Sequence, residues 1–426
     1  MMTSGNCHQP DPTFSLIATD GWSTNSVNAV IFRKSPLWTF ADTQYAAYYD
    51  QSKRFILACR TLPNGPWKTQ ATPFHGNVSD AHNSISIAVD GSGMLHAAWD
   101  HHNTSLKYAT AEPSNRLALG PLQTMLGERE ERVCYPEFYP FSNGDLLFAY
   151  RDGMSGNGNL VLNTFNHRTR TWSRIHSNLI DGGNRCNPYW QIHVDPADNI
   201  HISWCWRDTP DLSSNHDLCY AVSFDRGHSW QRSDGSPYAL PITVSNAELV
   251  WPIPVGSLLL NQTSMTADKD GHPIIASFWR EAGDIYPQYH VVYCEKGVWR
   301  RSVVTKRSSL HEVGGAGSRQ VPVSRPLVLA DPVSKRIYLI YRDCMERGGR
   351  VTVAVRSGFD DKNGCWEERD VTPDDQGYWE PSMDPAQWIM ARKIHLFLQK
   401  VAQPDGIDKD MGTYAPPEDV RVLELP

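Results

Sequence analysis

Short runs of residues that alternate between apolar and polar side chains recur along most of the chain, with turn-forming residues between them. The clearest example covers residues 84–99, where the runs 84–89 and 94–99 flank the turn residues Asp90 to Gly93. A period of two and a short glycine-containing turn predict an antiparallel β-hairpin. No long stretch has helical periodicity, so the pattern favours a protein built of many short strands.

A weak repeat runs through this pattern. Each unit contains a strand, a turn, and an apolar strand that ends in an aromatic residue followed by a charged one. The units end at Trp99-Asp100, Tyr150-Arg151, Trp206-Arg207, Trp279-Arg280 and Tyr341-Arg342. This spacing is typical of β-propeller blades, which take about 40 to 50 residues each. Residues 223–230 also match the Asp-box, Ser-x-Asp-x-Gly-x-(Ser/Thr)-Trp, a turn motif that marks propellers and does no chemistry.

The repeat predicts an all-β fold, a seven-bladed β-propeller of four-stranded antiparallel blades, in which residues 1–426 form one domain. The expected blades lie near residues 38–75, 80–125, 130–178, 185–245, 260–305, 320–370 and 378–426. Residues 14–33 remain, and we expect them to complete the last blade, because that closure removes a free sheet edge.

Composition narrows the class of ligand. The net charge of −7 argues against nucleic-acid binding through bulk charge, although a local arginine cluster could still hold an anionic substrate. No apolar run is long enough to cross a membrane, and residues 1–12 are polar with no signal-peptide core. The nine cysteines are odd in number and scattered, which does not resemble a dense disulfide framework. We therefore expect neither a nucleic-acid nor a membrane partner.

Four side chains stand at matched hairpin ends and are the candidate catalytic residues. His82 and His102 begin and end one hairpin, and Tyr135 and Arg151 begin and end the equivalent hairpin of the next blade. All four are predicted on one face of the central funnel. The set suits β-elimination from a uronic acid, because a guanidinium can neutralise the carboxylate while His102 or Tyr135 takes the C5 proton and protonates the leaving oxygen.

Structural alternatives compete with these roles. His101 is the neighbour of His102 and would point to the opposite side of a strand. Tyr135 could be a packed aromatic residue. Arg151 could form a structural ion pair with Asp152 or Asp100.

Further candidates surround this set. Arginine and asparagine can hold carboxylates and hydroxyls, and aromatic rings can stack on sugars. The candidate substrate-binding residues are Asn83, Arg185, Asn187, Tyr189, Arg207 and Arg325. His216 and Cys219 are candidate zinc ligands, since His and Cys are the usual partners of zinc. Residues 314–317 form a glycine-rich stretch that we interpret as a rim loop.

At these residues the chain resembles the seven-bladed propeller polysaccharide lyases, which include the ulvan lyases and the L-rhamnose-α-1,4-D-glucuronate lyases. The resemblance is carried by residues 21–33, 44–49, 82–83, 99–102, 150–153, 187–189 and 324–326. It implies a lyase that cleaves the L-rhamnosyl-α-1,4-D-glucuronate linkage and leaves a 4,5-unsaturated glucuronate. It also implies that His82, His102, Tyr135 and Arg151 are catalytic, with Arg151 and a histidine neutralising the carboxylate.

The resemblance also guides the expected substrate and partners. We favour arabinogalactan side chains such as those of gum arabic, because the chain is compact and has no appended module. The alternatives are an ulvan lyase, an α-L-rhamnosidase of a related propeller family, and a non-catalytic carbohydrate-binding propeller. An acidic polysaccharide or oligosaccharide is the expected partner, as the substrate. We expect the protein to be a monomer, and the substrate implies that it acts outside the cell. No cofactor is expected for the chemistry, and the family implies a structural calcium or zinc ion.

Overall fold

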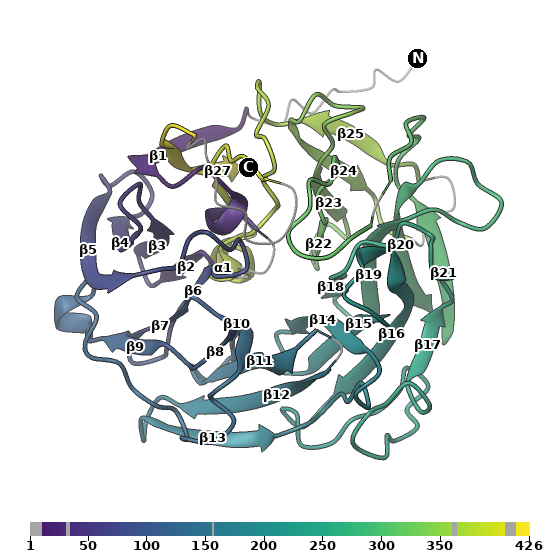
Figure 1. The fold of residues 1–426 in the computed structure, drawn as a ribbon, viewed down its shortest axis with the longest axis horizontal. Helices are drawn as coiled ribbons and strands as arrows, with labels where there is room; N and C mark the ends of the chain where they lie inside the picture. Colours follow the sequence, from purple (N-terminus) through teal and green to yellow (C-terminus); the bar gives the residue numbers. More distant parts are fainter. Residues whose placement is uncertain (1–10, 31–34, 156, 313, 360–363, 405–414) are drawn as a thin grey trace.

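The computed structural model describes residues 11–30, 35–155, 157–312, 314–359, 364–404 and 415–426. In these residues seven antiparallel sheets are arranged in a ring around a central axis (Figure 1). The sheets follow one another in chain order, which confirms the seven-bladed β-propeller predicted from the sequence. No helix among the described residues is long and apolar enough to span a bilayer.

Each blade is built of strands that are close together in the sequence, and the last blade also takes one strand from the N-terminal end. Blade 1 contains β2 (Leu37–Phe40), β3 (Thr43–Tyr49), β4 (Arg54–Thr61) and β5 (Lys68–His75). Blade 2 contains β6 (Ile85–Val89), β7 (Leu95–Trp99) and β9 (Tyr108–Ala111). Blade 3 contains β8 (His102–Thr104), β10 (Val133–Pro140), β11 (Leu146–Met154), β12 (Asn157–Asn166) and β13 (Thr171–His176).

The remaining blades follow the same plan. Blade 4 contains β14 (Asn187–Val194), β15 (Ile200–Arg207), β16 (Asn215–Ser223) and β17 (Glu248–Trp251). Blade 5 contains β18 (Ser264–Ala267), β19 (Pro273–Trp279), β20 (Gln288–Glu295) and β21 (Val298–Val303). Blade 6 contains β22 (Leu327–Ala330), β23 (Ile337–Arg342), β24 (Val351–Arg356) and β25 (Glu367–Asp370). Blade 7 contains β1 (Thr13–Gly21), β26 (Ile394–Leu398) and β27 (Glu418–Leu425).

Short helical segments link some of these strands. They are the 3-10 segments η1 (Ser26–Asn28), η2 (Pro113–Asn115) and η3 (Leu212–Ser214), and the α-helix α1 (Pro385–Ala391). The Asp-box turn forms as its sequence predicts. The Asp225 carboxylate accepts from the Ser229 amide at 2.8 Å, and Trp230 is buried. The eight described cysteines are all free thiols.

Burial explains why apolar and polar side chains do not alternate regularly in every strand. Every residue of β3 and of β15 is buried, whereas the outer strand β21 alternates between exposed and partly buried positions. The inner strands lie between neighbouring blades, so both of their faces are covered and both favour apolar or hydrogen-bonded side chains. The hydrophobic clusters accordingly join residues of adjacent blades.

One strand departs from the regular pattern. β8 leaves blade 2 and pairs with β10 of blade 3, with Cys134 opposite His102. Blade 2 therefore has three strands and blade 3 has five. The exchange matters for function because it carries His102 into the sheet that also holds Tyr135 and Arg151.

The two ends of the chain meet in blade 7, where β1 pairs antiparallel with β27 and Thr13 lies opposite Glu424. A buried carboxylate joins this blade to blade 1. Asp384 caps α1 and also accepts from the Thr39 amide at 3.1 Å and from Gln44 Nε2 at 2.8 Å. These bonds close the ring, because they connect the last blade to the first through side chains as well as through packing.

Candidate active site

A cavity of about 280 Å³ is lined by strand ends and by segments between strands from several blades. Residues from the N-terminal segment and from blades 2, 3, 4, 6 and 7 contribute to its wall. All four candidate catalytic residues, His82, His102, Tyr135 and Arg151, line this cavity. The structure thus brings together side chains that are up to 69 positions apart in the sequence, from position 82 to position 151.

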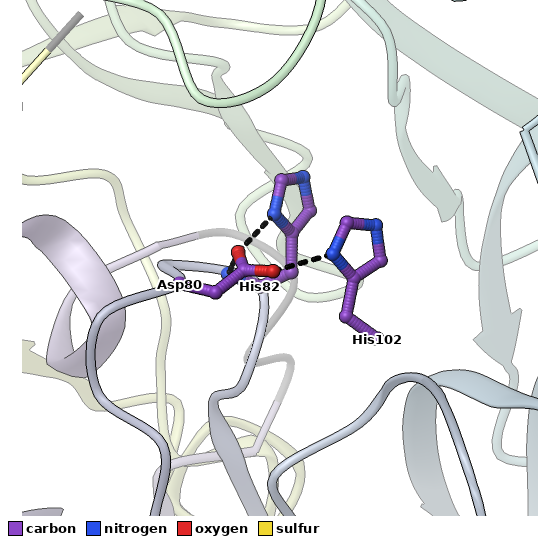
Figure 2. A group of neighbouring side chains, drawn as sticks. All are labelled: Asp80, His82 and His102. Atoms are coloured by element: carbon purple, nitrogen blue, oxygen red, sulfur yellow. Dashed lines mark hydrogen bonds and ion pairs between the residues drawn. The ribbon is translucent and has the colours of Figure 1, made fainter. Parts of the chain in front are cut away.

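Asp80 connects the two histidines (Figure 2). Its Oδ1 atom lies 2.6 Å from Nδ1 of His82, and its Oδ2 atom lies 2.5 Å from Nδ1 of His102. The two rings stack on each other with their centroids 4.1 Å apart. An ionised carboxylate only accepts hydrogen bonds, so both Nδ1 atoms carry a proton, and in the neutral form of either ring the proton-accepting nitrogen is Nε2.

The environment fixes these protonation states. Burial raises the pKa of Asp80, but the interactions with His82 and His102 outweigh it and hold that pKa well below its usual range. Burial, together with the neighbouring His102, lowers the pKa of His82 to about 4. At neutral pH the cluster therefore consists of a carboxylate and a neutral His82, which suits proton acceptance at Nε2.

Local backbone irregularities aim Tyr135 at the cavity. The pairing of β10 with β11 shifts register between Cys134 and Glu137, and Tyr135 has a φ of 54°. A non-glycine residue in this region is uncommon and tends to occur where a side chain must be redirected for function. Burial raises the pKa of Tyr135 far above its usual value, against the opposing effect of Arg151, so the phenol stays protonated.

Arg151 lies beneath Tyr135, with its guanidinium carbon 4.7 Å from the ring centroid. Its Nε donates to the Gly153 carbonyl at 3.0 Å and its Nη2 donates to the Cys134 sulfur at 3.2 Å. Its Nη1 is buried and has no hydrogen-bond partner among the described residues. Gly158 gives this side chain room, because a Cβ atom there would lie 2.5 Å from Cδ of Arg151.

The ion-pair alternative for Arg151 is wrong for the described residues. Asp152 pairs with Arg129 at 3.1 Å and with Arg132 at 3.2 Å, and Asp100 pairs with Lys107. The guanidinium of Arg151 is therefore available to a ligand rather than neutralised by either acid.

His101 is likewise separated from the site. It is fully buried, accepts from the Lys107 amide at 3.1 Å, and does not line the cavity. The adjacent His102 does line it, as expected for neighbours that point to opposite sides of the chain.

Tyr189 and Arg207 form a second arginine–tyrosine pair in the cavity wall. Nη1 of Arg207 donates to the Tyr189 hydroxyl at 3.1 Å, and the guanidinium carbon of Arg151 lies 6.0 Å from the same ring. Burial raises the pKa of Tyr189, but Arg207 and Arg151 lower it more, to about 8. Tyr189 is thus a polar phenol between two cations and not only a flat surface for stacking.

The other predicted binding residues are placed differently. Arg325 lines the cavity, but its Nη1 contacts both oxygens of Glu380, at 2.8 and 2.9 Å. Asn83 and Asn187 do not line it; their amides bond the carbonyls of Asn77 and Met154. Arg185 lies on an exposed turn outside the cavity. The Gly-rich stretch does reach the site, through Ala316 and Gly317.

The predicted zinc ligands lie on β16, outside the cavity. His216 contacts Asp217 at 3.0 Å and Asp208 at 3.2 Å, and Cys219 is buried. Among the described residues, two groups of three or more metal-ligating side chains come together, and neither contains His216 or Cys219. One is Asp80, His82 and His102, and the other is the exposed turn group Asp268, Asp270 and His272.

Sequence reasoning missed Asp80 and Arg342, which both line the cavity. Asp80 had a usable signal, because it lies two positions before His82 and an Asp can bond the amide and ring of such a neighbour. Arg342 occupies the same place in its repeat unit as Arg151 and Arg207, and the repeat itself was the signal.

The chain was compared with known proteins. It is 25% identical to the long isoform of an ulvan lyase from Glaciecola sp. (strain KUL10), over 33% of this chain and 18% of that protein. The chain therefore matches about a fifth of the length of this relative. Its fold resembles that of polysaccharide lyase Uly1, with a TM-score of 0.69, 15% identity, and coverage of 97% of this chain and 98% of the other.

A second solved structure has the same fold. It is a PL25 ulvan lyase bound to -[GlcA(1-4)Rha3S]-, with a TM-score of 0.70, 14% identity, and coverage of 95% of this chain and 100% of the other. Residues 43–307, well over half of the sequence, match the BNR repeat-containing family. The propeller fold, its repeats and this match agree, and the chain belongs to the BNR repeat-containing family.

Proposed function

We propose that this protein is a polysaccharide lyase that cleaves the L-rhamnosyl-α-1,4-D-glucuronate linkage by β-elimination, which breaks the C4–O4 bond of the glucuronate. The observation that carries the proposal is which of the buried arginines have a carboxylate partner and which do not. Five arginines are buried among the described residues, namely Arg60, Arg151, Arg207, Arg307 and Arg342. Arg60 and Arg307 bind the carboxylates of Glu424 and Asp343, at 2.6 and 2.5 Å.

The other three buried arginines have no carboxylate partner within the described part of the chain, and they are the ones that line the cavity. A buried charge without a counter-ion is unfavourable, so this wall favours an anionic ligand. Beside it stands a pair of histidines whose Nε2 atoms can accept protons. A cationic wall next to a proton acceptor is what removal of a proton beside a carboxylate requires.

The proposed steps follow from these positions. Arg151 and Arg207 neutralise the glucuronate carboxylate and so make the C5 proton more acidic. Nε2 of His102, whose side chain is 36% exposed, takes that proton. The electrons of the C5–H bond form the C4–C5 double bond, the C4–O4 bond breaks, and the rhamnose-bearing oxygen leaves.

Tyr135 is the proposed acid that protonates the leaving oxygen, because its raised pKa keeps the hydroxyl protonated. In a D-glucuronate the C5 hydrogen and O4 lie on the same ring face, so base and acid must stand side by side. The rings of His102 and Tyr135 have centroids 6.5 Å apart, which supports this arrangement. Every step uses groups of this chain.

The polysaccharide remains a matter for experiment. Arabinogalactan side chains are our first expectation from the sequence, whereas two of the three relatives named above are ulvan lyases. Both polymers present the same type of bond. A structural calcium or zinc ion and a monomeric state remain predictions.

The test incubates the protein with gum arabic and with ulvan and follows the ultraviolet absorbance of the conjugated double bond. We expect the absorbance to rise with at least one polymer, and product masses to identify the bond. Free rhamnose without absorbance would indicate a rhamnosidase, and binding without product would indicate a non-catalytic propeller. Both results would refute the lyase.

Variants test the site separately from the reaction. His102→Ala and Arg151→Ala should each lose most of the activity. Arg280→Ala is the matched control, because Arg280 has the same place in its repeat as Arg151 but lies outside the cavity. Full activity in both His102→Ala and Arg151→Ala would make the site assignment wrong even if the protein is a lyase.

A further inference from the structure

Arg342 lines the same cavity as His82 and His102. It is the last residue of β23 in blade 6, three blades further round the ring than Arg151, and Figure 1 shows β22 and β23 across the centre of the ring from β10. Its side chain is 1% exposed. No step proposed above uses this residue.

The hydrogen bonds of Arg342 hold the guanidinium in place without neutralising it. Nε donates to the Trp379 carbonyl at 3.0 Å, Nη1 to the Pro322 carbonyl at 3.1 Å and to the Cys344 sulfur at 2.8 Å, and Nη2 to the Val321 carbonyl at 3.2 Å. A guanidinium has five N–H donors, so one donor on Nη2 is left over. The positive charge has no acidic partner among the described residues.

The nearest acid along the chain, Asp343, is engaged elsewhere. It binds Arg307 at 2.5 Å. Glu380 also lines the cavity, but it forms the two-oxygen contact with Arg325. The carboxylates next to Arg342 are therefore committed to other arginines, and the charge of Arg342 remains directed at the cavity.

The surroundings of Arg342 repeat those of the other two cavity arginines. Its guanidinium carbon lies 5.5 Å from the Tyr378 ring centroid, as Arg151 lies over Tyr135 at 4.7 Å and Arg207 over Tyr189 at 5.2 Å. The loop that carries Gly317 and Arg319 completes this part of the wall. The cavity thus has two cationic regions, one beside the histidines and one at Arg342.

We propose that Arg342 forms a second anion subsite, which binds a sulfate ester or carboxylate on a sugar adjacent to the glucuronate that reacts. This inference rests on the proposed function, since it names the substrate class of the same cavity. A guanidinium recognises both groups through charge-assisted hydrogen bonds, so the shared chemistry is a planar or tetrahedral oxyanion. The preferred substrate therefore carries at least two anionic groups on neighbouring sugars.

The test measures binding by calorimetry in the His102→Ala background, where no turnover is expected. The probes are an unsulfated rhamnosyl-glucuronate disaccharide, the same disaccharide with a sulfate ester on rhamnose, and an unsulfated tetrasaccharide with two glucuronates. We expect at least one of the two dianionic probes to bind about tenfold more tightly than the monoanionic one. The probe that does so identifies the source of the second anion.

Arg342→Gln should remove this difference while it leaves the affinity for the monoanionic disaccharide nearly unchanged. Arg336→Gln, an exposed arginine of the same blade, is the matched control and should change nothing. A folded Arg342→Gln protein that keeps the preference would overturn the proposal. If that variant does not fold, equal affinity of the unmodified Arg342 protein for all three probes gives the same refutation.

The outcomes also separate this inference from the proposed function. A preference for the dianionic probes in a protein that makes no unsaturated product would leave the subsite standing and refute the lyase. Unsaturated product from a protein without that preference would support the lyase and refute the subsite at Arg342.

Discussion

Asp80 should be as important for turnover as the histidines that it connects. Asp80→Asn keeps the size of the side chain but removes the negative charge and replaces one acceptor oxygen by an amide donor. The bonds at risk are those to Nδ1 of His82, at 2.6 Å, and of His102, at 2.5 Å. The asparagine can accept from only one of these two rings.

The other ring must then carry its proton on Nε2, where it can no longer accept one from the substrate. The change removes at least one hydrogen bond to a charged group, which contributes about 1.5–3 kcal/mol. Since about 1.4 kcal/mol corresponds to a tenfold change in rate, we expect kcat to fall between about tenfold and 150-fold. KM should change little, because Arg151 and Arg207 still bind the carboxylate.

A change in the charge of His82 does not account for the expected fall in kcat. Burial already lowers the pKa of His82 to about 4, and Asp80 is one of the groups that raise it. Without Asp80 that pKa falls further, so the ring remains neutral at pH 7. The expected defect is therefore in tautomer and orientation, and lowering the pH within the folded range should not restore activity.

The assay compares initial rates of double-bond formation over a range of substrate concentrations. Asp195→Asn is a matched control, because Asp195 contacts His201 at 3.4 Å in a similar acid–histidine pair outside the cavity. It should lower thermal stability slightly and leave kcat unchanged. An Asp80→Asn protein that is folded and retains kcat within about twofold of the wild type would contradict the role of the bridging carboxylate.

Three further predictions concern the cavity and the closure of the ring. Tyr189 has a pKa of about 8, and its phenolate would compete with the substrate carboxylate for Arg207 and Arg151. When KM is measured against pH, it should therefore rise above pH 8 in the wild type but not in Tyr189→Phe. Gly158→Ala places a Cβ atom 2.5 Å from Cδ of Arg151, so the guanidinium is displaced and kcat/KM should fall about tenfold. An unchanged kcat/KM would contradict the proposed position of Arg151. Asp384→Ala leaves buried donors of blade 1 and α1 unpaired, so the free energy of unfolding in urea should fall by about 3–5 kcal/mol, and a fall below about 1 kcal/mol would contradict its role in closure.

The fold and the central residues of the site could be predicted because both follow from local repetition. Five aromatic-plus-charged hairpin ends recur at the spacing of propeller blades, dividing the whole chain at this spacing predicts seven blades, and the structure has seven sheets. The same repeat placed Tyr135 and Arg151 at matched ends of one hairpin, and both line the cavity. A pattern of this kind is visible in one sequence because each blade solves the same packing problem.

Contacts between distant segments could not be predicted in the same way. The exchange of β8 into blade 3 depends on its pairing with β10, and nothing within residues 102–104 indicates that partner. Asn83 and Asn187 have the polar character of sugar-binding residues, but both are buried and their amides bond backbone carbonyls. Buried polar side chains require such partners, so a polar residue near a site often serves the backbone instead.

The arginines illustrate a case in which sequence neighbours mislead. Each of the three buried cavity arginines is followed directly by an aspartate, as Arg151-Asp152, Arg207-Asp208 and Arg342-Asp343, which suggests three local ion pairs. Successive residues of a strand point to opposite faces, so the aspartate turns away from the arginine that precedes it. The aspartates contact other basic side chains, at 3.1, 3.2 and 2.5 Å, namely Arg129, His216 and Arg307.

This arrangement separates charge across the strand. The aspartate holds the outer structure of the blade, and the arginine faces the cavity without an acidic partner among the described residues. Arg280 has the same place in the repeat but is followed by Glu281, and it does not line the cavity. The Arg-Asp pair at the end of a second blade strand therefore marks the blades that supply cations to the cavity. By this reasoning Asp152→Asn should weaken the contacts of Arg129 and Arg132 and lower stability, while substrate binding through Arg151 changes little.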